Sequence, residues 1–211
     1  MPLASFVFPV RYVSEGVAVQ TTSRELSALG IAVRSLAPPH VGARVSMALY
    51  LPNVAIPEVA IGRVARASAE APAQSGFWAD FIVVDPQARM RIAHLLSARD
   101  EHEGPDLRTF DRFPVRLSVR FRTAQEFVDE HATNLSRGGI FIRSDDPPPV
   151  NSSVEVEISL PDGGAPVSSA GVVVHQVLPG GKKEAGAGVQ FVDASDAFRD
   201  RLDRYMASLS N

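Results

Sequence analysis

Residues 113–122 read FPVRLSVRFR, and this stretch decides the fold class of the 211-residue chain. Five apolar side chains alternate here with five residues that are polar, basic or proline. A period of two places one set on the buried face of a β-strand and the other set in water. The stretch therefore predicts a half-buried strand whose outward face carries Arg116, Arg120 and Arg122.

The residues after this strand continue the pattern of a small β-protein. Further strand-like runs are GIFIRS, SVEVEISLP, SAGVVVHQV and GAGVQFVD, separated by the turn signals DDPPP, DGG and PGG. The period then changes to 3.6, with Ser195 as the N-cap of a helix whose inward stripe is Phe198, Leu202, Tyr205 and Leu209. Short strands followed by one helix favour a small antiparallel barrel or sandwich, and we expect a six-stranded barrel.

The first half of the chain repeats this organisation. FPVR at 8–11 recurs at 113–116, and GIAVRS at 30–35 returns as GIFIRS at 139–144. The offset grows from 105 to 109 between these landmarks, which predicts a loop four residues longer in the second copy. Other residues that reappear 109 positions later are Pro38, Pro39, Val41, Val45, Leu51, Pro52 and Gly62.

Both copies end in a predicted helix, and a polar segment joins them. In the first copy Asp85 is the expected cap and Pro86 the first helical residue, and the inward residues are Ala88, Ile92, Leu95 and Leu96. The segment SARDEHEGPDLRTFD has the composition of a linker. We expect a mainly β protein with two six-stranded antiparallel barrels, each followed by an α-helix. The predicted boundaries are 1–97 for the first domain, 98–107 for the linker and 108–211 for the second domain.

The composition excludes several classes of function. The absence of cysteine rules out disulfides, thiolate zinc sites and cysteine nucleophiles, and the five histidines never occur at metal-ligand spacing. No nucleophile elbow, phosphate-binding loop or dinucleotide-binding glycine motif is present. We therefore expect no enzymatic activity, no metal and no cofactor.

No apolar run approaches the roughly 20 residues that cross a bilayer, and no export signal begins the chain, so we expect a cytoplasmic protein without membrane insertion.

Positive charge is concentrated at the start of the second copy. The net formal charge of the chain is −3, but RTFDRFPVRLSVRFR at 108–122 holds five arginines against the single carboxylate of Asp111. Arginine presents a planar fork of donors that can meet phosphate oxygens or the N7/O6 edge of guanine. This segment is the candidate site for an anion, although a solvated basic strand would have the same composition.

A second motif, NLSRGG at 134–139, precedes the strand that begins at Ile140. Alone it would be a turn. Together, an Arg-x-x-x-Arg followed by Asn-x-Ser-x-x-Gly on a small barrel resembles the PilZ domain, the bacterial receptor module for cyclic di-GMP. The resemblance covers about Leu107 to Leu209 and includes the stretch from Gly186 to Asp193.

The resemblance implies a ligand site, with one ambiguity. Both Arg108 with Arg112 and Arg112 with Arg116 have the required spacing, and we prefer Arg108 and Arg112 because Arg116 already lies inside the alternating strand. These two arginines would hold the phosphates and the guanine edges. Asn134, Ser136 and Gly139 would line the other wall, and Arg116 and Arg137 are secondary candidates.

The first copy departs from the family pattern. At the offset of 105, Leu3 and Val7 stand where Arg108 and Arg112 would be, and at the offset of 109 Glu25 stands at the position of Asn134. A carboxylate without cationic partners would repel a dianionic dinucleotide. The first copy is therefore interpreted as a degenerate PilZ-like barrel that contacts the second copy or a partner protein.

The resulting hypothesis is a cyclic di-GMP effector that relays a second-messenger signal through interdomain rearrangement or partner contacts. By the resemblance, its partner would act in motility, exopolysaccharide production or transcriptional control. One alternative is a PilZ adaptor that binds no nucleotide and acts through protein contacts. Another is a small barrel that binds nucleic acid, which the few aromatics and the negative net charge disfavour.

Overall fold

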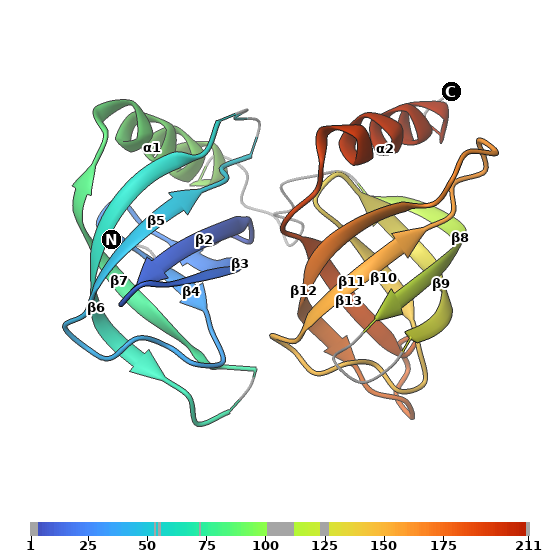
Figure 1. The fold of residues 1–211 in the computed structure, drawn as a ribbon, viewed down its shortest axis with the longest axis horizontal. Helices are drawn as coiled ribbons and strands as arrows, with labels where there is room; N and C mark the ends of the chain where they lie inside the picture. The colour runs from blue at the N-terminus through green and yellow to red at the C-terminus, as the bar shows by residue number, and fades with distance from the viewer. Residues whose placement is uncertain are drawn as a thin grey trace. The chain divides into compact units, whose positions relative to one another are not determined.

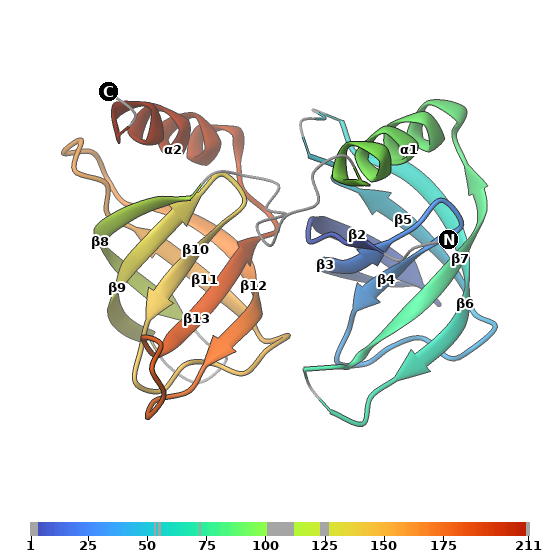
Figure 2. The same cartoon turned by 180° about the vertical axis from the view of Figure 1, so that it is seen from behind.

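The computed structural model describes residues 4–52, 54, 56–71, 73–100, 112–122 and 127–209. The chain divides into two compact units, Met1–Thr109 and Phe110–Asn211. Within each unit the strands form a barrel and a single helix follows the last strand (Figure 1 and Figure 2). No helix in these described ranges is long and apolar enough to cross a membrane.

The first unit is an antiparallel barrel closed by the pairing of β3 with β4. Around the sheet the strands follow the order β1-β3-β2-β5-β6-β7-β4. The two-residue β1 pairs with the last residues of β3, Ala4 with Leu26 and Ser5 with Glu25. The elements are β1 (Ala4–Ser5), β2 (Pro9–Ser14), β3 (Val17–Leu26), β4 (Gly30–Arg34), β5 (Arg44–Leu49), β6 (Glu58–Ser68), β7 (Gly76–Val84) and α1 (Pro86–Asp100).

The second unit is a closed antiparallel barrel with the order β10-β13-β12-β11-β8-β9. The predicted fold class, two six-stranded barrels each followed by a helix, is confirmed. The elements of the second unit are β8 (Phe113–Arg122), β9 (Phe127–Ser136), β10 (Gly139–Arg143), β11 (Ser153–Ile158), β12 (Val167–Val177), β13 (Gly186–Phe191) and α2 (Asp196–Leu209).

Strand pairing shows how the residues of the two barrels correspond. Val10 of β2 pairs with Leu49 of β5, and Val119 of β8 pairs with Ile158 of β11, which is a shift of 109 residues on both strands. The same offset relates β4, β5 and β6 to β10, β11 and β12. It becomes 110 only at the last strand and the helix, so the two units are one topology used twice.

The predicted offset of 105 at the FPVR segments is therefore wrong, and so is the longer loop inferred from it. Phe113 pairs with Leu135 as Ala4 pairs with Leu26, so Phe113 corresponds to Ala4 rather than to Phe8. An error of four residues is an even shift, which keeps every side chain on the same face of its strand. Alternation alone could not detect it.

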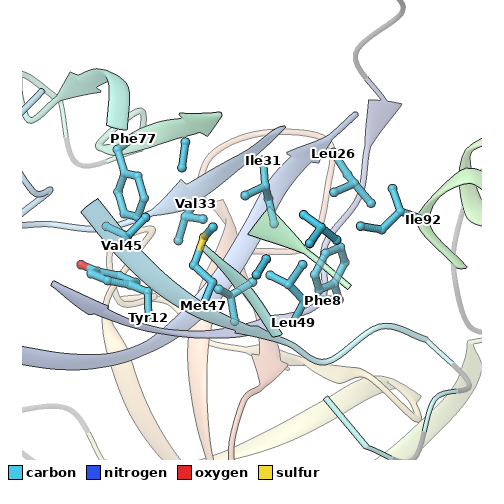
Figure 3. Close-up of a cluster of buried hydrophobic side chains, with 14 of the residues drawn as sticks. Phe8, Tyr12, Leu26, Ile31, Val33, Val45, Met47, Leu49, Phe77 and Ile92 are labelled. Carbon is cyan, nitrogen blue, oxygen red and sulfur yellow. The ribbon is translucent and has the colours of Figure 1, made fainter. Parts of the chain in front are cut away.

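A closed apolar core fills each barrel, and the helix seals one side. In the first unit the side chains converge from β2, β3, β4, β5 and β7, and Ile92 adds the contribution of α1 (Figure 3). Tyr12 packs edge-on against Phe77 at 5.0 Å between ring centroids, and its hydroxyl lies 2.9 Å from Ser35 Oγ. Burial raises the pKa of Tyr12, while the Ser35 contact opposes that shift.

The second core confirms the inward face predicted for β8, since Leu117, Val119 and Phe121 are buried. Phe113 and Val115, nearer the start of the strand, are only half-buried. The rings of Phe191 and Phe198 meet edge-on at 5.0 Å between centroids and thereby join β13 to α2.

Both helices begin at their predicted caps. Asp85 Oδ1 accepts a hydrogen bond from Gln87 N at 2.8 Å, and Ser195 Oγ accepts one from Phe198 N at 3.2 Å. The helix α1 continues to Asp100, three residues into the segment that the sequence assigns to the linker. Most of that segment, residues 101–107, lies outside the described residues.

One position of the predicted helical stripe differs. Met206, rather than Leu209, is buried beside Phe198 and Leu202, while Leu209 is 40% exposed near the helix end and Tyr205 is half-buried. Spacings of three and four residues both fit a period of 3.6, so Met206 continues the stripe from Leu202 as well as Tyr205 does.

Candidate functional site

Three chain segments that carry the candidate residues meet at one end of the second barrel. Arg112 directly precedes β8, whose Pro114 pairs with Asn134 of β9. Ser136 ends β9 and pairs with Gly139, the first residue of β10. The register thus brings Arg112, Asn134 and the turn after β9 to neighbouring positions, although 22 residues of sequence separate Arg112 from Asn134.

The arginine pair is only partly described. Arg108 lies outside the described residues, whereas Arg112 is exposed just before the strand. Arg116 is also exposed, at the bulge where the register between β8 and β9 shifts by one residue. Bulges redirect neighbouring side chains, so both arginine pairs stay open as candidates.

Charge on the outer face of β8 is compensated toward one end only. Arg122 donates to Glu155 Oε2 at 2.6 Å, and Arg120 lies opposite Glu157 on β11. No carboxylate of the described residues forms an ion pair with Arg116, nearer the start of the strand. Arg116, in the half of β8 nearer the β9–β10 turn, is therefore the strand arginine without a carboxylate partner among the described residues.

Asn134 lies between two strands at the centre of this region. It is half-buried, with Pro114 of β8 on one side and Phe141 of β10 on the other. Its side-chain amide has no hydrogen-bond partner among the residues that the structure describes. A half-buried amide offers two donors and an acceptor, so Asn134 is free to meet a polar ligand.

Ser136 holds the turn closed. Its hydroxyl accepts a hydrogen bond from Gly139 N at 3.2 Å and lies 3.1 Å from Gly139 O, to which it donates. Ser27 makes the same contacts with Gly30 in the first unit, at 3.1 Å and 3.3 Å. A clamp present in both units serves the turn itself, and a contact of Ser136 with ligand stays a prediction.

Gly139 is required by strand packing. A Cβ at this position would lie against the carbonyl oxygen of Val189 on β13, far inside van der Waals contact. Gly30 faces Ala79 of β7 in the same way. Close approach of two strands therefore explains both glycines, and a ligand is not needed to explain either.

Arg137, a secondary candidate, is engaged elsewhere. Its Nε lies 2.8 Å from Asp203 Oδ1 on α2, and both side chains are largely exposed. Exposed pairs of this kind stabilise a fold by about 1 kcal/mol or less. The contact does direct Arg137 toward the helix.

Sequence reasoning missed the aromatic member of the region. Phe141 is half-buried on the outer face of β10, opposite Asn134 on one side and Gly188 on the other. Its ring lies against Gly186 of β13, where a Cβ would meet the ring carbons Cε1 and Cζ at 2.9 and 3.0 Å. The signal was the difference between GIFIRS and GIAVRS, which puts Ala32 at the equivalent position of the first unit.

In the described ranges no three His, Cys, Asp or Glu side chains gather in a way that could hold a metal ion. The arrangement on the second barrel can instead bind a polyanion with a flat base, since the exposed Arg112 and Arg116, the Asn134 amide and the half-buried ring of Phe141 lie on neighbouring strand positions.

Comparison with protein families gives one match, the PilZ domain, over residues 106–208. The chain contains a PilZ domain. The second unit is the PilZ domain, and the first unit is a PilZ-like copy, because its strands pair in the same order. In either alignment the first copy has no arginine at the position of Arg112. At the observed offset of 109, the positions of Arg112 and Arg116 are occupied by Leu3 and Val7.

Solved structures resemble the chain at low identity. The inhibitor of motility MotI/DgrA of Bacillus subtilis is 14% identical, with a TM-score of 0.44 over 99% of this chain and 97% of that chain. YcgR from Escherichia coli, in complex with cyclic di-GMP, is 10% identical, with a TM-score of 0.42 over 97% and 84%. MrkH of K. pneumonia, also in complex with cyclic di-GMP, is 11% identical, with a TM-score of 0.41 over 96% and 86%. Comparison with curated proteins gives no match.

Proposed function

We propose that this protein is a cyclic di-GMP-binding effector whose ligand site lies on the second unit. The observation that carries the proposal is a contrast between the two units. Both keep the clamped Ser-x-x-Gly turn, but only the unit that matches the PilZ family has arginines before its first strand and an uncommitted Asn134 beside the turn.

Each residue has a proposed role. Arg108 and Arg112 bind the phosphates and guanine edges through charge-assisted hydrogen bonds. Asn134 meets a polar edge of the base, and Phe141 offers a face on which a purine can stack. Ser136 and Gly139 act first on the turn and hold Asn134 in position.

Calorimetric titration of the full chain with cyclic di-GMP tests the proposal. We expect saturable binding, and much weaker or no binding of cyclic di-AMP and GMP. A charge-assisted hydrogen bond contributes about 1.5–3 kcal/mol, so Arg112→Ala should weaken binding about ten- to a hundredfold. Arg11→Ala, an exposed arginine on the first unit, is the matched control and should leave binding unchanged.

The same titration separates the two arginine pairs. If Arg108 and Arg112 form the pair, Arg108→Ala weakens binding about tenfold or more, and Arg116→Ala does markedly less. The reverse ranking would assign the pair to Arg112 and Arg116. Absence of binding by the unchanged chain would favour the adaptor without nucleotide, and displacement of cyclic di-GMP by single-stranded nucleic acid would favour the nucleic-acid-binding barrel.

The output we propose is a change in how the two units are arranged, or in their contacts with a partner. Arg108 and Arg112 end the segment that joins the units, so a ligand held by both residues constrains that segment. Scattering profiles with and without saturating cyclic di-GMP test this step. Unchanged dimensions would leave partner contacts as the route of signalling.

A further inference from the structure

The two units differ sharply in the apolar surface that they expose. Of the twelve large apolar side chains exposed among the described residues, ten belong to the first unit and two, Leu178 and Leu209, to the second. Scattered exposed apolar residues need no explanation, but a contiguous group is a mark of an interaction surface.

Four of these residues and their neighbours form one continuous face, here called the β6–β7 face. On β6 the side chains of Val59 and Ile61 lie two residues apart and point outward, with Val59 60% exposed. Across the sheet Ile61 pairs with Val83 of β7, and the neighbouring bulge exposes Ile82. Val13 of β2 continues the same row beyond Ser46 of β5.

The second unit shows that the fold does not require this apolar face. The positions equivalent to Val59, Ile61 and Val83 are Ser168, Ala170 and Asp193. The position of Val13 is taken by Arg122, which binds Glu155 at 2.6 Å. The same strands thus fold with a polar, charge-paired surface in one unit and with an apolar surface in the other.

Arginines flank the apolar residues. Arg11 pairs with Ala48, which pairs in turn with Val59, so Arg11 lies at one end of the face. At the other end Arg44 and Arg63 lie directly opposite each other, and like charges in this position destabilise a sheet. No carboxylate of the described residues forms an ion pair with Arg11, Arg44 or Arg63.

One carboxylate lies beside these arginines on the sheet. Asp80 of β7 is opposite Arg63, and its Oδ1 accepts a hydrogen bond from Trp78 Nε1 at 2.7 Å. Its single negative charge offsets only one of the two arginines Arg44 and Arg63, so this end stays positive. The face therefore presents an apolar centre between two positively charged ends. Its charge complement is a segment with apolar side chains in the middle and carboxylates on either side.

We propose that the β6–β7 face of the first unit is a docking surface for an acidic, amphipathic segment of a partner protein. Apolar side chains of the segment cover Val59, Ile61 and Val83, and its carboxylates meet Arg11 and the Arg44–Arg63 pair. The first unit, which lacks the ligand arginines, thereby contributes the contact through which the protein acts. This inference does not depend on cyclic di-GMP binding.

Selection from a display library of random short peptides on the full-length chain tests the proposal. The comparison variant combines Val59→Ser, Ile61→Ala and Val83→Asp, which are the residues that the second unit carries on the same strands. We expect selected peptides to combine aliphatic or aromatic residues with several carboxylates, and to bind the variant at least about tenfold more weakly. The double variant Arg44→Gln and Arg63→Gln should weaken binding of the same peptides and reduce its salt dependence. Peptides without an acidic excess, or peptides that bind the variant equally well, would overturn the proposal.

A labelling experiment distinguishes a partner from the chain's own surfaces. Because the chain has no cysteine, Val59→Cys creates a single reactive thiol, and Leu178→Cys, at a position 63% exposed in the second unit, is the matched control. We expect both thiols to react with a maleimide dye at similar rates at low and high protein concentration. Protection of Val59→Cys at every concentration would show that the second unit covers the face, and protection only at high concentration would show that a second copy does. Either result would contradict the proposal that a separate partner protein binds this face.

Discussion

Replacing one serine in each unit separates a structural role of the Ser-x-x-Gly turn from a role in ligand binding. The Ser136 hydroxyl is buried and makes two contacts with Gly139, and Ser27 makes the matching contacts with Gly30. Loss of a buried hydrogen-bonding group costs about 1–3 kcal/mol. For a domain of about 100 residues, each kcal/mol lowers Tm by about 4–8 °C. Ser136→Ala and Ser27→Ala should therefore destabilise their own units by similar amounts.

The sequence supplies a probe for each unit. Trp78, the single tryptophan, lies in the first unit, so its fluorescence reports the unfolding of that unit, while circular dichroism reports both. In urea, Ser27→Ala should move the Trp78 transition to lower denaturant concentration and Ser136→Ala should leave that transition in place. Ser136→Ala should instead move the transition of the second unit to a lower urea concentration, and this shift should appear in circular dichroism but not in Trp78 fluorescence.

Binding measurements complete this test. If Ser136 only holds the turn, Ser136→Ala should weaken cyclic di-GMP binding less than Arg112→Ala does, because Asn134 and the arginines remain. The reasoning would be refuted by a variant that keeps the full stability of the second unit but loses binding as completely as Arg112→Ala. Ser136 would then be a direct ligand contact.

Three further substitutions test the packing of the second unit. Gly139→Ala should cost about 1–3 kcal/mol, because its Cβ meets the rigid carbonyl of β13, and thermal unfolding measures the loss. Ser195→Ala removes the N-cap of α2 and should lower stability by about 1 kcal/mol, read from urea midpoints. The Arg201 guanidinium, helped by a backbone N–H, holds the pKa of Asp162 below its ordinary value, so the contribution of this pair is present above about pH 4 and is lost as pH falls through the lowered pKa. Asp162→Asn should therefore flatten the acid limb of a plot of Tm against pH.

The barrels could be predicted from the sequence because burial on one face imposes a period of two. Leu117, Val119 and Phe121 were placed inward for this reason, and they are buried. The pattern did not reveal β9, since Asp129, Glu130 and His131 interrupt the alternation in its middle. A strand can tolerate such a run when its partners on both sides supply the hydrogen bonds of the backbone.

The alignment of the two copies shows the limit of local identity. FPVR occurs twice, but strand register depends on how whole strands pair, and a short match does not encode it. The shift of 109 residues emerges only from the strand pairs, when the pair Val10–Leu49 is compared with the pair Val119–Ile158. At either offset an apolar residue, Val7 or Leu3, stands at the position of Arg112.

The candidate site was predictable as a set of residue types but not as a set of roles. Asn134 and Ser136 are two residues apart, yet their side chains differ in role. The amide of Asn134 makes no hydrogen bond to the described residues, whereas the hydroxyl of Ser136 closes a turn. That difference arises from contacts with Gly139, which spacing cannot show. Phe141 was missed because its two neighbours in the strand are also apolar, so the sequence gives no contrast between the faces. The burial of Ile140 and Ile142 shows that Phe141, between them, is on the outer face.

Hydrogen exchange of the full chain with and without saturating cyclic di-GMP tests most directly whether one of the two barrels holds the ligand. We predict protection over residues 112–118 and 133–141 of the second unit. The equivalent segments of the first unit, 3–9 and 24–32, should exchange at unchanged rates, because Leu3 and Val7 occupy the positions of Arg112 and Arg116. Protection of the first-unit segments, or no protection in either unit, would contradict a ligand site on the second barrel.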